Sequence, residues 1–170
     1  MSNPIHPASG GLVRSPPSLE FASLPRAVTL LRNRILQSAA GRDIEDLKVP
    51  LGWNEVPPLF TKGQKAGFDP IEFLRKQSFD GRGLEMLAIL HAVFTQAFVR
   101  EMRGPVLSYV WPAFPVEPER APRPGAQLAP WRCVRFADLS IRGSDGKPLV
   151  HRASIGQDGT WHYFWTEPPA

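Results

Sequence analysis

The run from Leu149 to Trp165, LVHRASIGQDGTWHYFW, constrains the fold of this chain more than any other stretch. Two apolar arms rich in aromatic residues flank Asp158-Gly159, and this dipeptide between alternating arms is the strongest short-range signal for a β-hairpin. A two-residue turn predicts the cross-strand pairs Gln157–Thr160, Ile155–His162 and Ala153–Phe164. Alternation then places Trp161, Tyr163 and Trp165 on one face, and His162 and Phe164 on the other. Because both faces carry large apolar side chains, we expect the rest of the chain to cover both.

Length and composition indicate one globular domain. The chain has 170 residues, of which 42% are hydrophobic and 21% charged, and a chain of this length can bury a core without disulfides. Its 19 prolines are about twice the usual proportion, and they fall mainly in segments with loop composition. We therefore expect short helices and strands joined by long, ordered connections.

The net charge of +4 would permit contact with nucleic acid or with an anionic membrane. However, the arginines are scattered from Arg14 to Arg152, with no basic run and no helix face made only of cations, so nucleic acid is not the expected partner. No stretch approaches the ~20 apolar residues that span a bilayer, so no transmembrane segment is predicted. The N-terminal residues lack the pattern of a signal peptide, which favours a cytoplasmic location unless the start is misassigned.

Cys133 is the only cysteine, which excludes an internal disulfide and a cysteine-based zinc site. The adjacent Arg132 and Arg135 could lower the pKa of its thiol. The commoner role of such a cysteine is that of a small buried hydrophobic residue.

The N-terminal half predicts helices. Residues 1–22 form a Ser/Pro/Gly-rich tail that is expected to be disordered. Four helices are expected after it. The first runs from Ser23 to Gly41, with Pro25 in its first turn and Arg32 off its apolar stripe, and the second covers 44–48, capped by Asp43 and ending before Pro50. The third covers 70–77 and begins with the capping box Asp69-Pro70-Ile71-Glu72, and the fourth covers 84–102 and begins after Asp80-Gly81-Arg82-Gly83. The last is apolar on most of its circumference, which predicts a buried central helix with His91 in the core.

The C-terminal half predicts strands. Residues 107–114, LSYVWPAF, have strand composition, and Pro112 indicates an edge position or a very short strand. Residues 139–142 are expected to pair with 149–155 across a second Asp-Gly turn. Residues 131–136 fit either a short helix after Pro130 or a strand. The proline-rich segments 50–68 and 115–130 are expected to be connections, the first packed onto the body through Trp53, Phe60 and Phe68.

The predicted fold class is therefore α+β. About four N-terminal helices pack on a small C-terminal antiparallel sheet of about three strands that ends in the hairpin. Residues 23–166 form the single domain, with a helical part over 23–104 and a sheet part over 105–166.

With these segments placed, the chain resembles a family of small uncharacterised alphaproteobacterial proteins. The matching pieces, in order, are AVTLLRNRILQSAAGRDIEDL, NEVPPLF, DPIEFLRKQSFDGRGLEMLAIL, YVWPAF and IGQDGTWHYFW, which together cover roughly residues 25–166. Many similar proteins carry an N-terminal export signal, so the resemblance implies a periplasmic location, although this chain has a polar tail at that place. The resemblance implies no activity, and no catalytic residue is carried over from it.

Motifs of catalysis, metal binding and cofactor binding are not found. His6, His91, His151 and His162 lack ligand spacing, although His151 and His162 would share a face of the hairpin. There is no GxSxG, no SxxK and no glycine-rich phosphate loop. Asp69, Glu72 and Asp80 have helix-capping roles, which leaves Glu55 as the one acid of this group without a local structural role. We therefore assign no catalytic residue, no metal site and no cofactor.

Aromatic residues are the better candidate site. Tryptophans that cluster at a surface groove commonly bind glycans or proline-rich peptides, whereas the simpler alternative is that they fill the core of a proline-rich domain. The candidate binding residues are Trp53, Glu55, Tyr109, Trp111, Trp161 and His162. The sequence thus favours a non-catalytic binding or structural module that uses an aromatic surface for a protein, peptide or glycan. The alternative is a cell-envelope enzyme that uses Glu55 or Asp80 beside an aromatic cleft.

Overall fold

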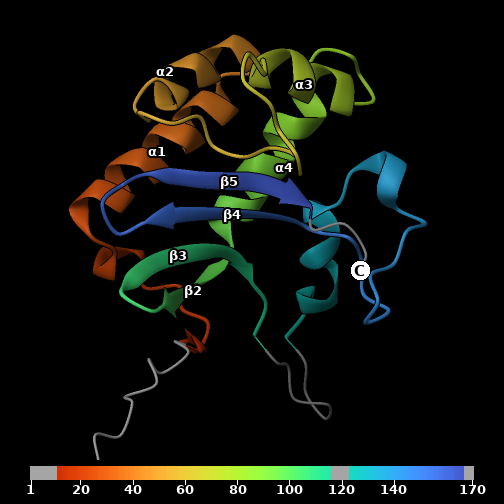
Figure 1. The fold of residues 1–170 in the computed structure, drawn as a ribbon. Helices are drawn as coiled ribbons and strands as arrows, with labels where there is room; N and C mark the ends of the chain where they lie inside the picture. Colours follow the sequence, from red (N-terminus) through yellow and green to blue (C-terminus); the bar gives the residue numbers. More distant parts are fainter. Residues whose placement is uncertain (1–10, 116–122, 167–170) are drawn as a thin grey trace, which may run out of the picture.

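The structure of the chain is a computed structural model that describes residues 11–115 and 123–166. Its architecture is α+β, as predicted (Figure 1). The described residues form one five-stranded antiparallel sheet in the order β1-β2-β3-β4-β5. The strands are β1 (Leu12–Arg14), β2 (Ala97–Arg103), β3 (Val106–Ala113), β4 (His151–Gly156) and β5 (Trp161–Thr166). The α-helices are α1 (Arg26–Ala40), α2 (Lys48–Leu51), α3 (Pro70–Gln77) and α4 (Leu84–Thr95).

Five short 3-10 helices add to this set within the described residues, so the predicted count of about four helices was too low. The predicted count of about three strands was too low as well, because the sheet has five. The 3-10 helices are η1 (Phe21–Ser23), η2 (Ile44–Leu47), η3 (Ala126–Leu128), η4 (Pro130–Cys133) and η5 (Phe136–Asp138). The ambiguity over residues 131–136 is thereby resolved: Pro130 begins a 3-10 turn, and Val134 is extended. The helix that Asp43 caps continues through Pro50 to Leu51, beyond its predicted end, because Pro50 lies in the first turn of α2, where its missing N–H is tolerated.

The helices cover one face of the sheet. Figure 1 shows α4 behind the strands, and α4 contacts α1 as well as β3 and β4. The core lies between these layers, and each fully buried large side chain contributes on the order of 2 kcal/mol. The largest fully buried side chains are Trp111, Trp161, Phe94, Phe98 and Phe164. We call the opposite side, away from α4, the open face of the sheet.

The helix predicted over 84–102 is two elements. The helix ends at Thr95, Gln96 is extended (ψ 171°), and residues 97–103 form β2. Apolar residues continue at helical spacing through Phe98, so the local pattern did not indicate that the chain changes from helix to strand after Thr95. Pairing of β2 with β1 and β3 outweighs the local helical preference. His91, predicted to be in the core, is exposed, and the sheet begins before the predicted boundary at residue 105.

Part of the predicted disordered tail is ordered. Leu12 to Arg14 pair with Arg103 to Glu101, and Ser18 bridges Phe98. Backbone pairing to β2 therefore orders a segment whose composition alone could not fold. Residues 1–10, including His6, lie outside the described residues, as do residues 116–122 of the predicted second connection.

The predicted strand over 139–142 is also wrong. Only Arg142 bridges Pro148, and β4 pairs instead with β3 and β5. As a consequence, β3 is a central strand of eight residues and not an edge. Pro112 is tolerated there because the β2 register shifts opposite it, and because the last pair with β4 is Trp111–Ala153.

The final hairpin is confirmed, but its register differs near the turn. Ala153 pairs with Phe164 as predicted, whereas Ile155 pairs with Trp161 and not with His162. Gly156 accepts from Gly159 N–H (2.9 Å), and Gly159 has a left-handed φ of 87°, so the turn contains an extra residue and a bulge. A Cβ at Gly159 would also approach Ala27 of α1 to 3.0 Å.

The bulge changes which side chains share a face. Trp161 joins Phe164 in the core, and Tyr163 stacks on Trp165 at 5.1 Å on the open face. His151 is buried on the core side, so His151 and His162 do not share a face as predicted.

Candidate binding surface

The predicted aromatic site is divided between the core and the surface. Tyr109, Trp111 and Trp161 are buried in the core cluster. Trp111 packs against Phe94 of α4, with ring centroids 5.1 Å apart. These side chains fill the space between sheet and helices, so this part of the predicted aromatic surface is not a surface.

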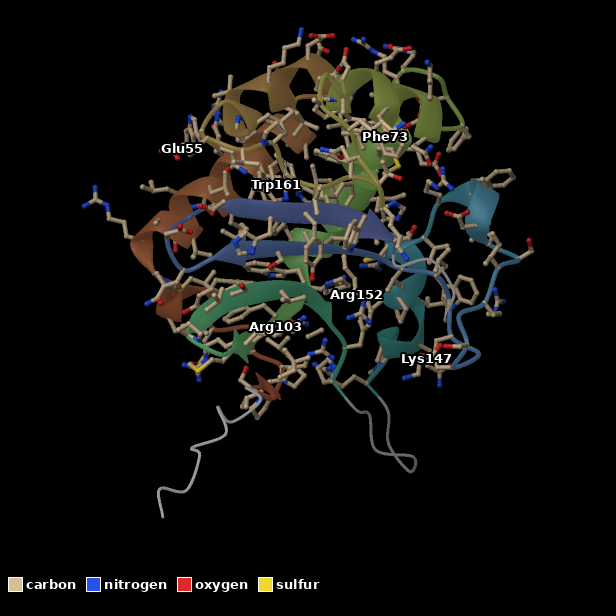
Figure 2. The ribbon with its side chains drawn as sticks, viewed as in Figure 1. Glu55, Phe73, Arg103, Lys147, Arg152 and Trp161 are labelled. Atoms are coloured by element: carbon tan, nitrogen blue, oxygen red, sulfur yellow. The ribbon has the colours of Figure 1, made fainter. Side chains whose placement is uncertain are left out.

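The other predicted residues lie outside the core. Trp53 is 54% exposed, and Glu55 is exposed beside it; Figure 2 shows Glu55 at the outline of the molecule and Trp161 inside it. His162 is half-buried, and its Nδ1 lies 3.4 Å from the Ser154 hydroxyl. Burial lowers the pKa of His162, against the opposing effect of Asp158.

Asp80, the other acid considered for catalysis, acts as a helix cap. Its carboxylate accepts hydrogen bonds from the amides of Arg82 (2.7 Å), Leu84 (3.1 Å) and Glu85 (2.8 Å). The predicted structural role is therefore confirmed, and the carboxylate oxygens are occupied by backbone donors.

An exposed aromatic pair lies elsewhere, and the sequence analysis missed it. Phe79 is 74% exposed and Phe136 is 68% exposed, with ring centroids 5.9 Å apart. Phe79 follows α3, and Phe136 opens η5. We call these two residues the phenylalanine pair. Single exposed apolar residues are ordinary on a protein surface, but two large aromatic rings in contact are not.

One carboxylate holds both members of the pair. The amide of Phe79 donates to Glu85 Oε2 (2.7 Å), and the amide of Phe136 donates to Glu85 Oε1 (2.6 Å). Glu85 itself lies in the first turn of α4. Because both bonds go to the backbone, the two segments that carry the rings are held next to each other by the fold.

A second connection fixes the Phe136 side. Arg135 Nε donates to Asp138 Oδ2 (2.7 Å), Nη2 donates to Oδ1 (3.0 Å), and the guanidinium also contacts the Gln77 side chain at the end of α3. Asp138 is buried. The bidentate ion pair holds the Arg135 guanidinium against η5, and the contact of that guanidinium with Gln77 ties η5 to α3, the helix that leads into Phe79.

No family model, curated protein or solved structure matches the chain.

A hollow that contains both cationic and acidic residues lies on the segment that follows Phe79 in the sequence. Arg82 is exposed three residues after Phe79, and it lines a hollow of about 310 Å³ together with Arg42, Arg75 and Asp43. Arg75 is engaged by Glu45. In the sequence, Phe136 is followed by Leu139, which is 40% exposed, and Phe79 is followed by Arg82, which makes no ion pair within the described residues and lines the hollow.

Two buried titratable groups, Cys133 and His151, have strongly shifted pKa values. Burial raises the pKa of the Cys133 thiol to about 12, against the opposing effect of Arg132, so the thiol is held in its protonated form. Burial lowers the pKa of His151 to about 4. No group of three or more His, Cys, Asp or Glu side chains among the described residues could hold a metal ion. In the same residues, no helix has the length and apolar character to cross a bilayer.

Proposed function

We propose that this chain is a non-catalytic binding module that recognises a protein partner through the phenylalanine pair. One observation carries the proposal: two contacting rings, 74% and 68% exposed, are held in place by a shared carboxylate that binds their backbone amides. The aromatic contact surface is thus formed by Phe79 and Phe136, and the buried tryptophans serve as core.

The energetics favour such a role. Burying a phenylalanine side chain against a partner gains roughly 1.5–3 kcal/mol, and a few large anchors commonly supply most of an interface's binding energy. Ordering flexible side chains and loops opposes association. The two bonds to Glu85 order the backbone segments that carry the rings before the partner arrives.

Charge indicates the kind of partner. Arg82 lies three residues after Phe79 in the sequence, and it lines one hollow with Arg42 and Asp43; the two arginines give this hollow an excess of guanidinium groups over the single Asp43 carboxylate. A segment with apolar side chains followed by carboxylates would pack its apolar part on the phenylalanine pair and form ion pairs with these guanidinium groups. We therefore propose a protein segment that is apolar at its centre and acidic at one end.

The test is a selection of displayed peptides on the full chain. Peptides are selected on the wild-type protein and depleted on the Phe79→Ser/Phe136→Ser variant. Val56→Ser, which changes an apolar residue that is 72% exposed elsewhere, is the matched control. We expect peptides with apolar residues and adjacent acids that bind the wild type and Val56→Ser equally and the double variant at least tenfold more weakly, a difference of about 1.4 kcal/mol.

Two results would contradict the proposal. Peptides that bind the wild type and the double variant equally would show that the pair is not the contact surface. A wild-type dimer in sedimentation that becomes a monomer in the double variant would show that a second copy covers the pair, and not a separate partner.

A further inference from the structure

A groove lies on the open face of the sheet, opposite the helices. Its volume is about 500 Å³, within the range of roughly 300–1,000 Å³ that is usual for small-ligand sites. Its floor comes from β2 and β3, through Val99, Val110 and Pro112. The alternation of the strands assigns these residues to the open face, because their neighbours Phe98, Tyr109 and Trp111 belong to the core cluster.

The walls of the groove are also largely apolar. They come from the end of β3 and from the connection that leads into β4. The apolar wall residues are Ala113, Phe114, Pro115, Pro130, Pro148 and Val150. A strongly hydrated inorganic anion would lose solvation on such walls without compensation, whereas a hydrocarbon body would be stabilised.

Arg152 places a cation in this apolar setting. It lies in β4 opposite Trp165, is half-buried and lines the groove. Within residues 11–115 and 123–166, its guanidinium makes no hydrogen bond or ion pair. Lys147 adds a second cation to the lining, and Figure 2 shows Lys147 and Arg152 on the same side of β4.

The other charged residues of the groove are already engaged. Arg14 donates to Glu101 (2.9 Å), and the Asp145 carboxylate accepts the amide of Lys147 (3.0 Å). Among the described lining residues, the Arg152 guanidinium and the Lys147 ammonium are the cationic donors without a side-chain partner. Of these two, the planar donor set of Arg152 suits a carboxylate in bidentate geometry.

We propose that this groove binds an organic carboxylate with an apolar body, its carboxylate on Arg152 and its hydrocarbon part on the valine and proline floor. The ligand is an amphiphile of small size, such as a medium-chain acid. This site is separate from the phenylalanine pair, and the proposal does not depend on that surface.

The experiment is a calorimetric titration of the full chain with decanoate, below the concentration at which decanoate aggregates. Decanol is the uncharged comparison ligand. We expect decanoate to bind at least tenfold more tightly than decanol. Arg152→Gln is expected to remove that difference, while Arg100→Gln, an exposed arginine of the same sheet that does not line the groove, is expected to keep it.

Two further measurements complete the test. Thermal unfolding shows whether Arg152→Gln remains folded, and Lys147→Gln changes an exposed residue and is expected to weaken decanoate binding less than Arg152→Gln. The phenylalanine-pair variant is expected to bind decanoate as the wild type does. Failure of decanoate to bind, equal binding of decanol, or a folded Arg152→Gln that binds decanoate normally would overturn the proposal.

Discussion

Arg32 shows how a single residue can join two parts of this fold. Its Nε and Nη2 donate to the Phe94 carbonyl at 3.0 and 2.8 Å, and the guanidinium lies 3.9 Å from the centre of the Phe21 ring. The Phe94 carbonyl belongs to the last turn of α4, where helix carbonyls lack partners. Arg32 thus satisfies the helix end at the point where the chain changes from α4 to β2.

We expect Arg32→Met to lower the free energy of unfolding by about 1.5–3 kcal/mol, because it leaves a buried carbonyl without its charged donor. Methionine retains most of the side-chain length, so the loss reports the hydrogen bonds more than the packing. Urea denaturation measures the effect. Arg26→Met, an exposed arginine of the same helix, is expected to change the value by less than about 0.5 kcal/mol, and an equal effect of both variants would contradict this role.

His151 makes stability depend on pH. It is buried, its Nδ1 has no partner, and burial lowers its pKa from 6.5 to about 4; the charge of Arg135 acts in the same direction, and that of Asp138 opposes it. The unfolded chain binds the proton first as the pH falls. The free energy of unfolding should therefore fall between pH 6.5 and 4, with His151 contributing on the order of 3 kcal/mol.

His151→Gln removes this titration. We expect the difference in unfolding free energy between wild type and variant to shift in favour of the variant as the pH falls from 7 to 4. Urea denaturation at each pH measures it. A difference that does not change with pH would show that His151 does not titrate between folding states in this range.

At the scale of elements, the loop over 54–60 acts as a cover for the edge of β5. Asn54 Nδ2 donates to the Trp161 carbonyl (2.7 Å), and its Oδ1 accepts the Trp161 amide (3.1 Å). Leu59 exchanges two backbone hydrogen bonds with β5, one with the His162 carbonyl and one with the Phe164 amide, both 2.9 Å. The Asn54 side chain and the Leu59 backbone thus bond to backbone groups of β5 that a neighbouring strand would otherwise use. These bonds explain how a segment so rich in proline remains ordered.

We expect Asn54→Ala to lower the free energy of unfolding by about 1–3 kcal/mol and to speed hydrogen exchange at the Trp161 amide, because both backbone groups of Trp161 lose their partner. The adjacent Glu55→Ala changes an exposed side chain and serves as the control. Unchanged exchange at Trp161 in Asn54→Ala would show that the loop does not protect this edge.

The elements that the sequence predicted correctly carry local signals. Asp69 caps α3 by accepting the amides of Ile71 and Glu72, and Asp43 caps η2 through the Glu45 amide. The β2 strand has no comparable signal, because its conformation depends on pairing with β1 and β3. The bulge before Trp161 likewise depends on how the hairpin packs on α1, and this single extra residue moved Trp161 from the predicted surface into the core.

At the scale of the whole molecule, the candidate site could not be predicted from local sequence, because it too depends on contacts between distant segments. Phe79 and Phe136 lie in separate segments, and Glu85 joins them only after α3, α4 and η5 have assembled. Nothing near Phe79 or Phe136 in the sequence indicates that either ring is exposed. Of the tryptophans that the composition emphasised, Trp111 and Trp161 are buried in the core, and only Trp53 is strongly exposed.

Cys133 provides a measure of global opening. Its thiol is buried and its pKa is raised to about 12, so at pH 8 we expect iodoacetamide to modify it about a thousandfold more slowly than an unfolded thiol. Labelling should accelerate in urea along with unfolding, and earlier in Arg32→Met than in the wild type. Rapid labelling of a fully folded chain would place the thiol in contact with solvent and would contradict this expectation.

The covered edges of the sheet have a consequence for recognition. A partner that adds a strand needs a run of unpaired backbone groups. In the described residues, β1 offers only three residues at one edge, and Asn54 and Leu59 occupy backbone positions of β5 at the other. Strand addition therefore finds few free backbone groups at the described edges. A protein that bound this chain as proposed would contact side chains, so single substitutions in that surface would change its selectivity while the sheet remained intact.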